Sequence, residues 1–290
     1  MISIIITAFR EPEGVRKGLD AFLSQKLPKG YEILVVAPDA ETRKVVEDFS
    51  KVYPQVKFVR DLGKGKPAAL NVAFERSKGS TLILTDGDVY AAPSAVEELL
   101  KPFKEKRVGL VTGRPVSLER RDTMLGFWSH LLTDVAHRVR MKSDFIVGSG
   151  YLMAIRRVIV EKVPENALAD DAVISNVIFE RGFRTVYAPD AKVFVKYPDN
   201  FSDWVKQKKR SAGGYIQLEE LVDGEERMRS FSKESMGLPM VVTYFRNLRQ
   251  TFWVFVLVLA RLYLWFLILV DVKLRRKSFK EVWVRVESTK

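Results

Sequence analysis

The sequence predicts an α/β protein: a mostly parallel sheet with helices on both faces, followed by an apolar helical region. Two observations support this prediction. Short β-rich runs alternate with amphipathic helical stretches from residue 1 to about residue 115, which is the pattern of a sheet covered by helices. Of the 290 residues, 47% are hydrophobic and 29% are charged, so the chain can bury a substantial core and still carry a smaller appendage.

The expected elements follow in chain order. Residues 2–7 form a short apolar run with no basic segment before it, which favours a buried first strand over a signal sequence. Pro67 and Pro93 open two of the helices, where a missing N–H costs nothing because the first turn has no internal acceptor for it. We expect strands at residues 2–7, 33–37, 56–59, 81–85 and 108–112, and helices at residues 13–25, 41–51, 67–77 and 93–104.

The composition limits which cellular compartment and which binding partners are expected. The chain has no cysteine, which excludes disulfides, thiolate metal sites and a cysteine nucleophile, and favours a reducing compartment. Its net charge of +12 favours an anionic partner. The basic residues crowd into residues 206–210 and 273–280, on both sides of a very apolar segment, and no common nucleic-acid-binding signature occurs. We therefore expect a membrane, and no nucleic acid, as the partner.

The loop after the fourth expected strand carries Asp86 and Asp88. Ligands of such sheets bind beyond the carboxyl ends of the strands, so both carboxylates can face the ligand crevice. Hard oxygen ligands at this spacing suit Mg²⁺ or Mn²⁺, which would bridge a diphosphate and offset the charge on a leaving nucleotide. An ordinary acidic turn is the structural alternative.

A second acidic pair, Asp170 and Asp171, precedes the apolar pattern of an amphipathic helix and would lie in its first turn. Capping of the helix and interaction with its dipole would explain two acids at this position. The functional alternative is a general base, which a single displacement by a sugar hydroxyl would require.

Residues 61–71 place two glycines and two lysines at a strand-to-helix junction. Flexible backbone and ammonium groups at such a junction can reach a phosphate. The segment lacks the P-loop pattern, and a solvated lysine turn is the alternative.

In this order, these elements resemble the family 2 glycosyltransferases, which have the A-type glycosyltransferase fold. The resemblance extends from residue 1 to about residue 215, and the ordered set is more specific than any single motif. The matching segments are Ile5-Ile6-Thr7-Ala8-Phe9-Arg10-Glu11, Gly65-Lys66-Pro67-Ala68-Ala69-Leu70-Asn71, Asp86 to Asp88, Gly148-Ser149-Gly150, Asp170-Asp171, and the run from Arg181 to Asp190.

The resemblance implies a nucleotide-binding sheet and assigns roles to individual residues. Asp88, with Asp86, would hold Mg²⁺ or Mn²⁺ on the diphosphate. Asp171 would be the catalytic base, next to Asp170, which replaces the family's usual glutamate, and the anomeric carbon would be inverted. The implied nucleotide-binding residues are Thr7, Ala8, Phe9, Glu11, Asp39, Lys66, Asp86, Gln207 and Arg210.

The chain departs from the family pattern at several positions. Arg10 stands where the family often has asparagine, and Ala37-Pro38-Asp39 replaces the common D-D-x-S, which leaves the base open between uridine and guanosine. Gln207 to Arg210 looks like the Q-x-x-R-W element of processive members, with Ser211 in place of the tryptophan, which makes polymerisation less expected. A basic helix that faces anionic lipid would explain Gln207 and Arg210 equally well.

Residues 252–272 form an apolar and aromatic stretch long enough to cross a bilayer, but Arg261 lies near its middle. Basic residues lie on both sides of it, whereas a single span normally has its basic excess on the cytoplasmic side. An in-plane helix, a re-entrant helix, a span whose arginine is buried between protomers, and a buried soluble helix all remain open. A homo-oligomer formed through this helix is therefore one possibility. His130 and His137 lack a carboxylate at ligand spacing and are expected to be structural.

The sequence is therefore interpreted as a membrane-associated inverting glycosyltransferase with a cytoplasmic catalytic domain. It would use a UDP- or GDP-sugar and act on a lipid-phosphate or lipid-linked glycan acceptor. We expect the catalytic domain at residues 1–222, a linker at 223–240, and a membrane-associated helical region with a basic tail at 241–290. The alternatives are a polysaccharide synthase-like processive enzyme and a non-catalytic basic membrane adaptor. A sugar-nucleotide pyrophosphorylase is disfavoured because its early Gly-rich arginine loop is missing.

Overall fold

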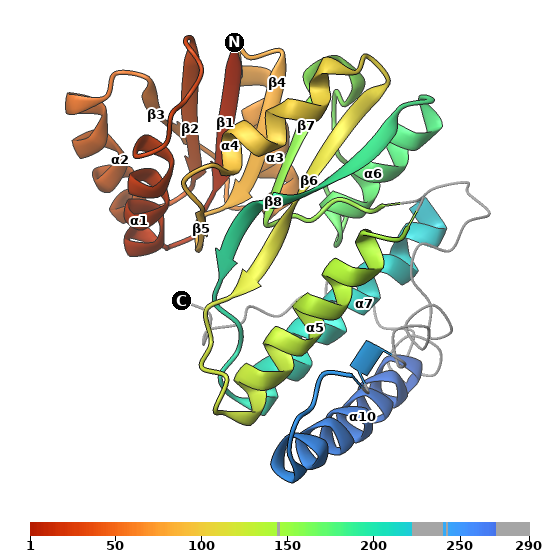
Figure 1. Cartoon of the computed structure of the whole chain (residues 1–290). Coiled ribbons are helices and arrows are strands. Elements are labelled where there is room, and N and C mark those ends of the chain that lie inside the picture. The colour runs from red at the N-terminus through yellow and green to blue at the C-terminus, as the bar shows by residue number, and fades with distance from the viewer. Residues whose placement is uncertain (144–145, 222–239, 242, 271–290) are drawn as a thin grey trace. The chain divides into compact units, whose positions relative to one another are not determined.

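The computed structural model describes residues 1–143, 146–221, 240–241 and 243–270 (Figure 1). The described residues divide into two compact units. The first combines Met1–Pro115 with Ser143–Val195, and the second combines Val116–Lys142 with the described residues from Lys196 onwards. Residues 223–239 of the expected linker and residues 271–290 of the expected basic tail lie outside the described residues, and the functional boundary near residue 222 stays a prediction.

The first unit is built on one eight-stranded sheet. Parallel pairs join β3 to β2, β2 to β1, and β1 to β4, whereas β7 pairs antiparallel with both β4 and β6, and β5 pairs antiparallel with β8. The α/β prediction is confirmed, and the parallel pairs belong to the half of the sheet that comes first in the chain. The strand order is β3 (Val56–Arg60), β2 (Tyr31–Ala37), β1 (Ile2–Thr7), β4 (Thr81–Asp86), β7 (Leu152–Arg156), β6 (Val108–Ser117), β8 (Arg184–Val195) and β5 (Val89–Ala91).

Helices cover both faces of this sheet, as expected. The crossovers from β1 to β2 and from β2 to β3 run in one direction along the sheet, and the crossover from β3 to β4 runs back. Because such crossovers are right-handed, the helices of the first two share one face and the helix of the third covers the other (Figure 1). The helices of this unit are α1 (Pro12–Leu23), α2 (Ala40–Val52), α3 (Lys66–Arg76), α4 (Ala95–Leu100) and α6 (Asp170–Glu180).

One expected helix is shorter than its pattern indicated. The stretch predicted as a helix at residues 93–104 forms α4 over Ala95–Leu100 and then a 3-10 helix over Lys101–Lys104. Pro102 explains the change, because it has no N–H for the carbonyl four residues earlier and its ring would clash there.

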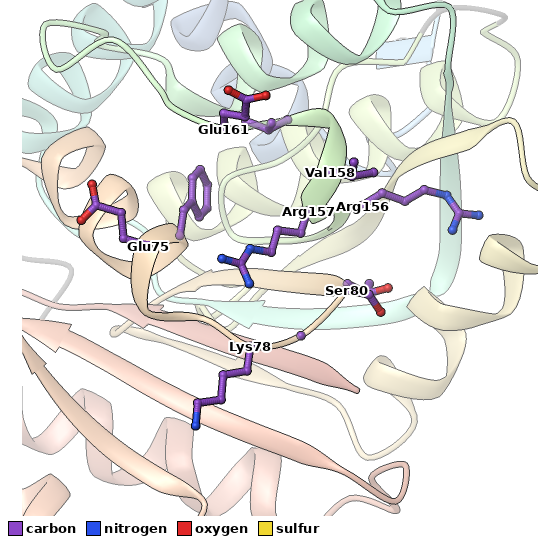
Figure 2. Close-up of a pocket in the computed structure, with 11 residues that line it drawn as sticks. Glu75, Lys78, Ser80, Arg156, Arg157, Val158 and Glu161 are labelled. Atoms are coloured by element: carbon purple, nitrogen blue, oxygen red, sulfur yellow. The ribbon is translucent and has the colours of Figure 1, made fainter.

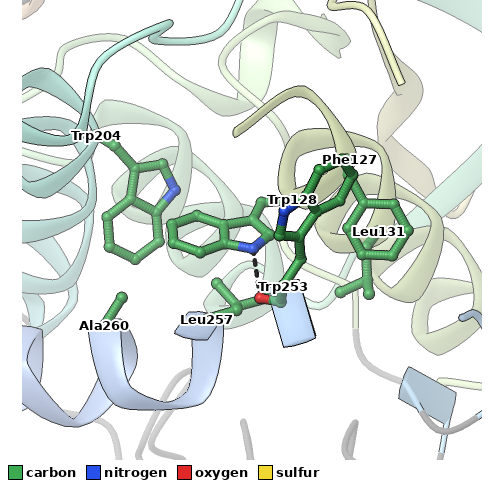
Figure 3. Packing of buried hydrophobic residues seen from close by; sticks show 7 residues of the cluster. All are labelled: Phe127, Trp128, Leu131, Trp204, Trp253, Leu257 and Ala260. Atoms are coloured by element: carbon green, nitrogen blue, oxygen red, sulfur yellow. Dashed lines mark hydrogen bonds between the residues drawn. The ribbon is translucent and has the colours of Figure 1, made fainter. Parts of the chain in front are cut away.

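The second unit contains three long helices: α5 (Met124–Arg140), α7 (Phe201–Leu221) and α10 (Leu248–Ile268). α10 contacts both α5 and α7. The indole Nε1–H of Trp128 on α5 donates to the backbone carbonyl of Trp253 on α10, at 2.8 Å. Figure 3 shows the aromatic and aliphatic side chains around this bond. We call this set the tryptophan cluster; it consists of Phe127, Trp128, Leu131, Trp204, Trp253, Leu257 and Ala260.

His130 has a structural role in this unit. It is buried on α5, and its Nε2–H donates to the backbone carbonyl of Glu119 at 2.7 Å. The carboxylate of Glu119 in turn accepts the backbone N–H of Tyr197 at 3.0 Å. The contacts of His130 are those of a residue that fixes a loop onto a helix.

Glu32 on β2 is a buried acid that joins segments at the opposite end of the sheet from the strands' carboxyl ends. Its side chain is 1% exposed. It accepts hydrogen bonds from the Ser3 hydroxyl at 2.8 Å, the Lys78 backbone N–H at 2.6 Å, and the Lys57 ammonium at 3.4 Å. Burial alone would raise the pKa of Glu32, but these donors outweigh burial and lower it.

We expect Glu32→Gln to lower the free energy of unfolding by about 1–3 kcal/mol at neutral pH, because it removes charge-assisted hydrogen bonds from a buried site. The stabilising contribution of Glu32 is present above its unfolded-state pKa, near 4.5, and is lost as the pH falls towards its lowered folded-state pKa. Urea unfolding between pH 3 and pH 7 measures both effects. The control is Glu47→Gln, whose carboxylate makes an exposed ion pair with Arg43; equal losses in the two variants would contradict the role of Glu32.

Candidate active site

The candidate site lies at the carboxyl ends of β1 and β4, the two adjacent parallel strands at which the direction of the crossovers reverses. Thr7 ends β1, Asp86 ends β4, and these residues are partners in the strand register. The Thr7 hydroxyl donates to the Asp86 carboxylate at 3.4 Å. Open α/β sheets bind their ligands at this kind of position.

The turn after β4 packs directly on the loop after β1. The backbone N–H of Gly87 donates to the Thr7 carbonyl at 2.8 Å. A Cβ atom on Gly87 would lie 2.7 Å from the Cβ of Ala8 and 3.2 Å from a carboxylate oxygen of Glu11. Only glycine fits between the two acids of the D-x-D, and this close approach brings Glu11 towards them.

Lys66, the first residue of α3, joins the two acidic elements. Its Nζ lies 2.8 Å from Oδ1 of Asp86 and 3.3 Å from Oδ2 of Asp170. It also donates to the backbone carbonyl of Gly150 at 3.4 Å. Burial alone would lower the pKa of Lys66, but the carboxylates of Asp170 and Asp86 outweigh it and hold the pKa well above its usual value. The ammonium group is therefore a fixed positive charge between the two acidic pairs.

The Asp171 carboxylate is held by backbone N–H groups. Its Oδ2 accepts from Gly150 at 3.0 Å and its Oδ1 from Ala172 at 2.9 Å. Burial and the neighbouring Asp170 raise the pKa of Asp171, although Lys66 and the two N–H donors offset part of this rise. An oriented carboxylate that is more basic than a surface aspartate is suited to accept a proton.

The Asp88 carboxyl group is buried near two other carboxylates. Burial, together with the carboxylates of Asp86 and Glu11, raises the pKa of Asp88 to about 7. Lys66 lowers this pKa by a smaller amount. The carboxyl groups of Asp86, Asp88 and Glu11 therefore form a group whose negative charge Lys66 offsets only in part.

The loop after β1 contacts the loop after β2. Arg10 has a left-handed backbone, with φ of 55°, and its N–H donates to Oδ2 of Asp39 at 2.9 Å. The resembled family often has asparagine here, which tolerates this conformation better than arginine does. Asp39 also caps α2, because its Oδ1 accepts from the Thr42 N–H at 2.9 Å. Phe9 is 42% exposed, beneath the Arg10 guanidinium at 5.5 Å.

Eight of the predicted residues thus come together in the first unit, and Asp39 lies just after β2, in contact with the Arg10 backbone. Gln207 and Arg210 are not part of this group, because both lie on α7 in the second unit. Gln207 is buried on that helix. Their predicted contact with the diphosphate stays a prediction. The eight are Thr7, Ala8, Glu11, Lys66, Asp86, Asp88, Asp170 and Asp171.

Gly150 and Ser175 hold the first turn of α6, and neither was assigned a role from the sequence. Gly150 gives its carbonyl to Lys66 and its N–H to Asp171. The Ser175 hydroxyl accepts the Gly148 N–H at 2.8 Å and donates to the Asp171 carbonyl at 2.6 Å. The Gly148-Ser149-Gly150 motif signalled the first of these, and the spacing of four residues between Asp171 and Ser175 on one helix signals the second.

The residues at the end of β4 fit a divalent cation. Asp86 and Asp88 offer hard oxygen donors. Burial, together with the carboxylates of Asp86 and Glu11, raises the pKa of Asp88, and a bound cation would favour its ionised form. No group of three or more His, Cys, Asp or Glu side chains arranged around one point occurs among the described residues. Two carboxylates with phosphate and water oxygens form a usual ligand set for Mg²⁺.

A hollow of about 720 Å³ lies elsewhere in the first unit and does not contain these residues (Figure 2). It includes Thr81, at the start of β4, and Arg156, at the end of the antiparallel β7. The Arg156 guanidinium is bound to the carbonyls of Phe103, Glu105 and Val108. The hollow is therefore at the opposite end of β4 from Asp86. Its Arg156 side chain holds the backbone of the segment between α4 and β6.

Comparison with known proteins decides the family. A family model described as "Glycosyltransferase like family 2" matches residues 1–214. The chain belongs to the family 2 glycosyltransferases. The match covers both acidic elements and the Lys66 loop, so the residues that lie together in the structure are within the family domain of this glycosyltransferase.

Curated relatives of the glycosyltransferase include two enzymes from different organisms. Hyaluronan synthase from Streptococcus pyogenes is 26% identical over 236 residues, which cover 72% of this chain and 55% of the relative. Glycosyltransferase AglE from Haloferax volcanii is 33% identical over 116 residues, which cover 39% of this chain and 38% of the relative. The chain thus spans about half the length of the hyaluronan synthase it matches.

Solved structures show the same fold. The mannosyltransferase PcManGT from Pyrobaculum calidifontis, in complex with GDP-Man and Mn²⁺, has a TM-score of 0.62 and 22% identity, over 77% of this chain and 65% of that one. TarS from S. aureus has a TM-score of 0.53 and 16% identity, over 72% of this chain and 64% of that one. The A-type glycosyltransferase fold expected from the sequence is confirmed.

We expect Mn²⁺ binding to the donor-free glycosyltransferase to strengthen up to about pH 7 and then level off, because the metal competes with the proton of Asp88. Glu11→Gln removes one nearby negative charge, so the midpoint of this pH dependence should move to lower pH. Calorimetric titrations between pH 5 and pH 8 test this. The control is Glu13→Gln. Glu13 is an exposed acid in the first turn of α1, the helix that begins just after Glu11, and its substitution should leave the midpoint unchanged.

Lys66→Met should leave the carboxylates of Asp86, Asp170 and Asp171 without their shared cation. We expect the free energy of unfolding at neutral pH to fall by about 1–3 kcal/mol, since uncompensated buried charges are destabilising. Lowering the pH to 5 should recover part of this loss by protonating a carboxyl group. Lys64→Met, in the exposed part of the same loop, should change stability little, and a pH-independent loss in Lys66→Met would contradict the bridging role.

Proposed function

We propose that this chain is an inverting glycosyltransferase that moves a sugar from a nucleotide-diphosphate donor to a lipid-phosphate or lipid-linked glycan acceptor. The donor would be a UDP- or GDP-sugar. One observation carries the proposal: the Lys66 ammonium joins the D-x-D at Asp86 to the Asp170-Asp171 pair. The metal-ligand candidates and the base candidate thereby belong to one site rather than to two unrelated acidic turns.

Proton transfer is assigned to Asp171. In a single displacement the acceptor hydroxyl loses its proton to the Asp171 carboxylate while its oxygen forms a bond to the anomeric carbon. The bond from that carbon to the diphosphate oxygen breaks on the opposite side, so the configuration inverts. The hydrogen bonds from Gly150 and Ala172 fix the carboxylate, and its raised pKa increases its basicity.

The D-x-D is assigned to the diphosphate. Asp88 would be the direct ligand of Mg²⁺ or Mn²⁺, and Asp86 would support it while it remains paired with Lys66. When bound, the metal would stabilise the negative charge that develops on the leaving nucleoside diphosphate. The PcManGT structure, which contains GDP-Man and Mn²⁺ on the same fold, supports a guanosine donor and Mn²⁺ as the first combination to try.

The nucleoside is assigned to the loops after β1 and β2. Thr7 ends β1, Ala8, Phe9 and Glu11 lie on the loop after it, and Asp39 lies on the loop after β2. The exposed Phe9 ring offers an apolar surface, and Asp39 offers oxygens to N–H groups of a base.

The acceptor assignment rests on α10. Among the described residues, this is the one helix that is long and apolar enough to cross a membrane. Association with a membrane from the cytoplasmic side would bring the enzyme to an acceptor that is insoluble in water.

The test is release of nucleoside diphosphate from a panel of UDP- and GDP-sugars with Mn²⁺ or Mg²⁺, in the presence of a membrane lipid extract. We expect Asp88→Ala to lose donor binding, and Asp171→Asn to bind the donor but to transfer at least about 100-fold more slowly, since general-base catalysis contributes about 10² to 10⁴. Asp48→Asn, in an exposed ion pair on α2, is the control.

Transfer that survives in Asp171→Asn would remove the assigned base. If no donor binds with any metal, the activity proposal fails, and a non-catalytic basic membrane adaptor becomes the better account.

A processive polysaccharide synthase is the second candidate. The similarity to hyaluronan synthase favours it, whereas Ser211 occupies the position of the family's tryptophan and argues against it. Product length separates the two: a single added sugar per acceptor supports the first proposal, and a ladder of products supports the second.

A further inference from the structure

We propose that α10 lies in the plane of an anionic membrane surface, with one face fixed on α5 and α7 and the opposite face in the lipid. The inference concerns the second unit alone and does not depend on the transfer chemistry. It selects one of the alternatives that the sequence left open for residues 252–272.

The two faces of α10 have different environments although both are apolar. The buried face consists of residues that recur every three or four positions, and it packs on α5 and α7. From Phe252 to Phe266 the other face carries seven large apolar side chains that are 39% to 61% exposed, and Leu269, directly after the last helical residue, extends this face. The buried residues are Trp253, Leu257, Ala260, Leu264 and Ile268, and the exposed ones are Phe252, Phe255, Val258, Leu259, Leu262, Tyr263, Phe266 and Leu269.

An ordinary surface helix has a polar outer face, because apolar patches of this extent are rare on soluble proteins and mark interaction sites. An interfacial membrane helix normally has one polar face and one apolar face. In α10 the packing on α5 and α7 takes the place of the polar face, so the second unit as a whole has the amphipathic character that the helix alone lacks.

The neighbours of α10 argue against a span. α10 has 21 residues, a length of about 30 Å, which matches a hydrocarbon layer. However, the buried face contacts Trp204 near the start of α7 and Ala212 about two turns later. A span would carry the α7 segment between them into the lipid, and charged side chains there are strongly disfavoured. That segment contains Lys206, Lys208, Lys209 and Arg210.

Charge at one end of α10 identifies the lipid as anionic. Arg246 and Arg249 are exposed at its start. Arg121 donates to the Tyr244 hydroxyl at 2.9 Å, and Arg138 donates to the Thr243 hydroxyl at 3.2 Å. The two contacts place Arg121 and Arg138 beside the residues that precede α10. Together with Arg246 and Arg249, four exposed arginines therefore lie near the beginning of the helix. Guanidinium groups beside an apolar stripe match phosphate headgroups above acyl chains.

The first experiment is co-sedimentation of the full chain with vesicles of phosphatidylcholine, with or without phosphatidylglycerol. We expect stronger binding to the anionic vesicles and at least about tenfold weaker binding for the double variant Phe255→Gln/Phe266→Gln, since each phenylalanine would lose its burial in lipid. The control is Val52→Gln/Val158→Gln, two side chains of the first unit that are at least as exposed. Equal binding by the two double variants would overturn the proposal.

The second experiment measures depth. The chain has no cysteine, so Phe252→Cys, Leu259→Cys and Phe266→Cys each provide a unique site for an environment-sensitive fluorophore. With quenchers at shallow and deep positions of the lipid, an in-plane helix places all three labels at one shallow depth. A deep label at position 259 between two shallow ones would show a span and overturn the in-plane geometry.

The same labels exclude other occupants of the exposed face. In lipid-free protein the label at position 259 should report water and should shift to an apolar spectrum when anionic vesicles are added. A label that is already in an apolar environment without lipid would mean that another part of the chain or a second copy covers this face. Sedimentation velocity then separates these two cases, and either one overturns the proposal.

Discussion

Lys66 is the residue on which the arrangement of the candidate site depends. Its ammonium group is within ion-pair distance of one carboxylate from each acidic element, and the pKa of Asp171 is also sensitive to it. Like charges placed this close repel one another, and the half-buried ammonium group between the two acidic elements offsets this repulsion. The positions of α3, β4 and the start of α6 are thereby linked through one side chain.

The two units of the chain use different physical means to form a surface. In the first, backbone strands place polar groups at their carboxyl ends, and tight contacts such as the one at Gly87 set the distances between loops. In the second, aromatic rings and the bond from Trp128 to the Trp253 carbonyl hold three helices together. The candidate polar site thus belongs to the sheet unit, and the exposed apolar face of α10 belongs to the helical unit.

The fold and the family were predictable because strand and helix periodicity, glycine and proline positions and the acidic motifs are local signals. The bridge at Lys66 was not, because it joins three segments that are distant in the sequence and depends on side-chain geometry. The 3-10 turn after α4 could have been predicted from Pro102. The grouping of α5 and α7 with α10 could not, because residues 124–139 and 201–221 have apolar patterns that fit a sheet face equally well.

Asp39 shows how one side chain can restrict the evolution of specificity. One of its oxygens caps α2 and the other holds the left-handed Arg10, so both oxygens already serve the folded state. Any substitution at this position would alter a helix terminus and a strained loop together, whatever it did for a ligand. A change of nucleobase preference in a descendant of this protein would therefore meet a structural cost at Asp39 in addition to any change in ligand binding.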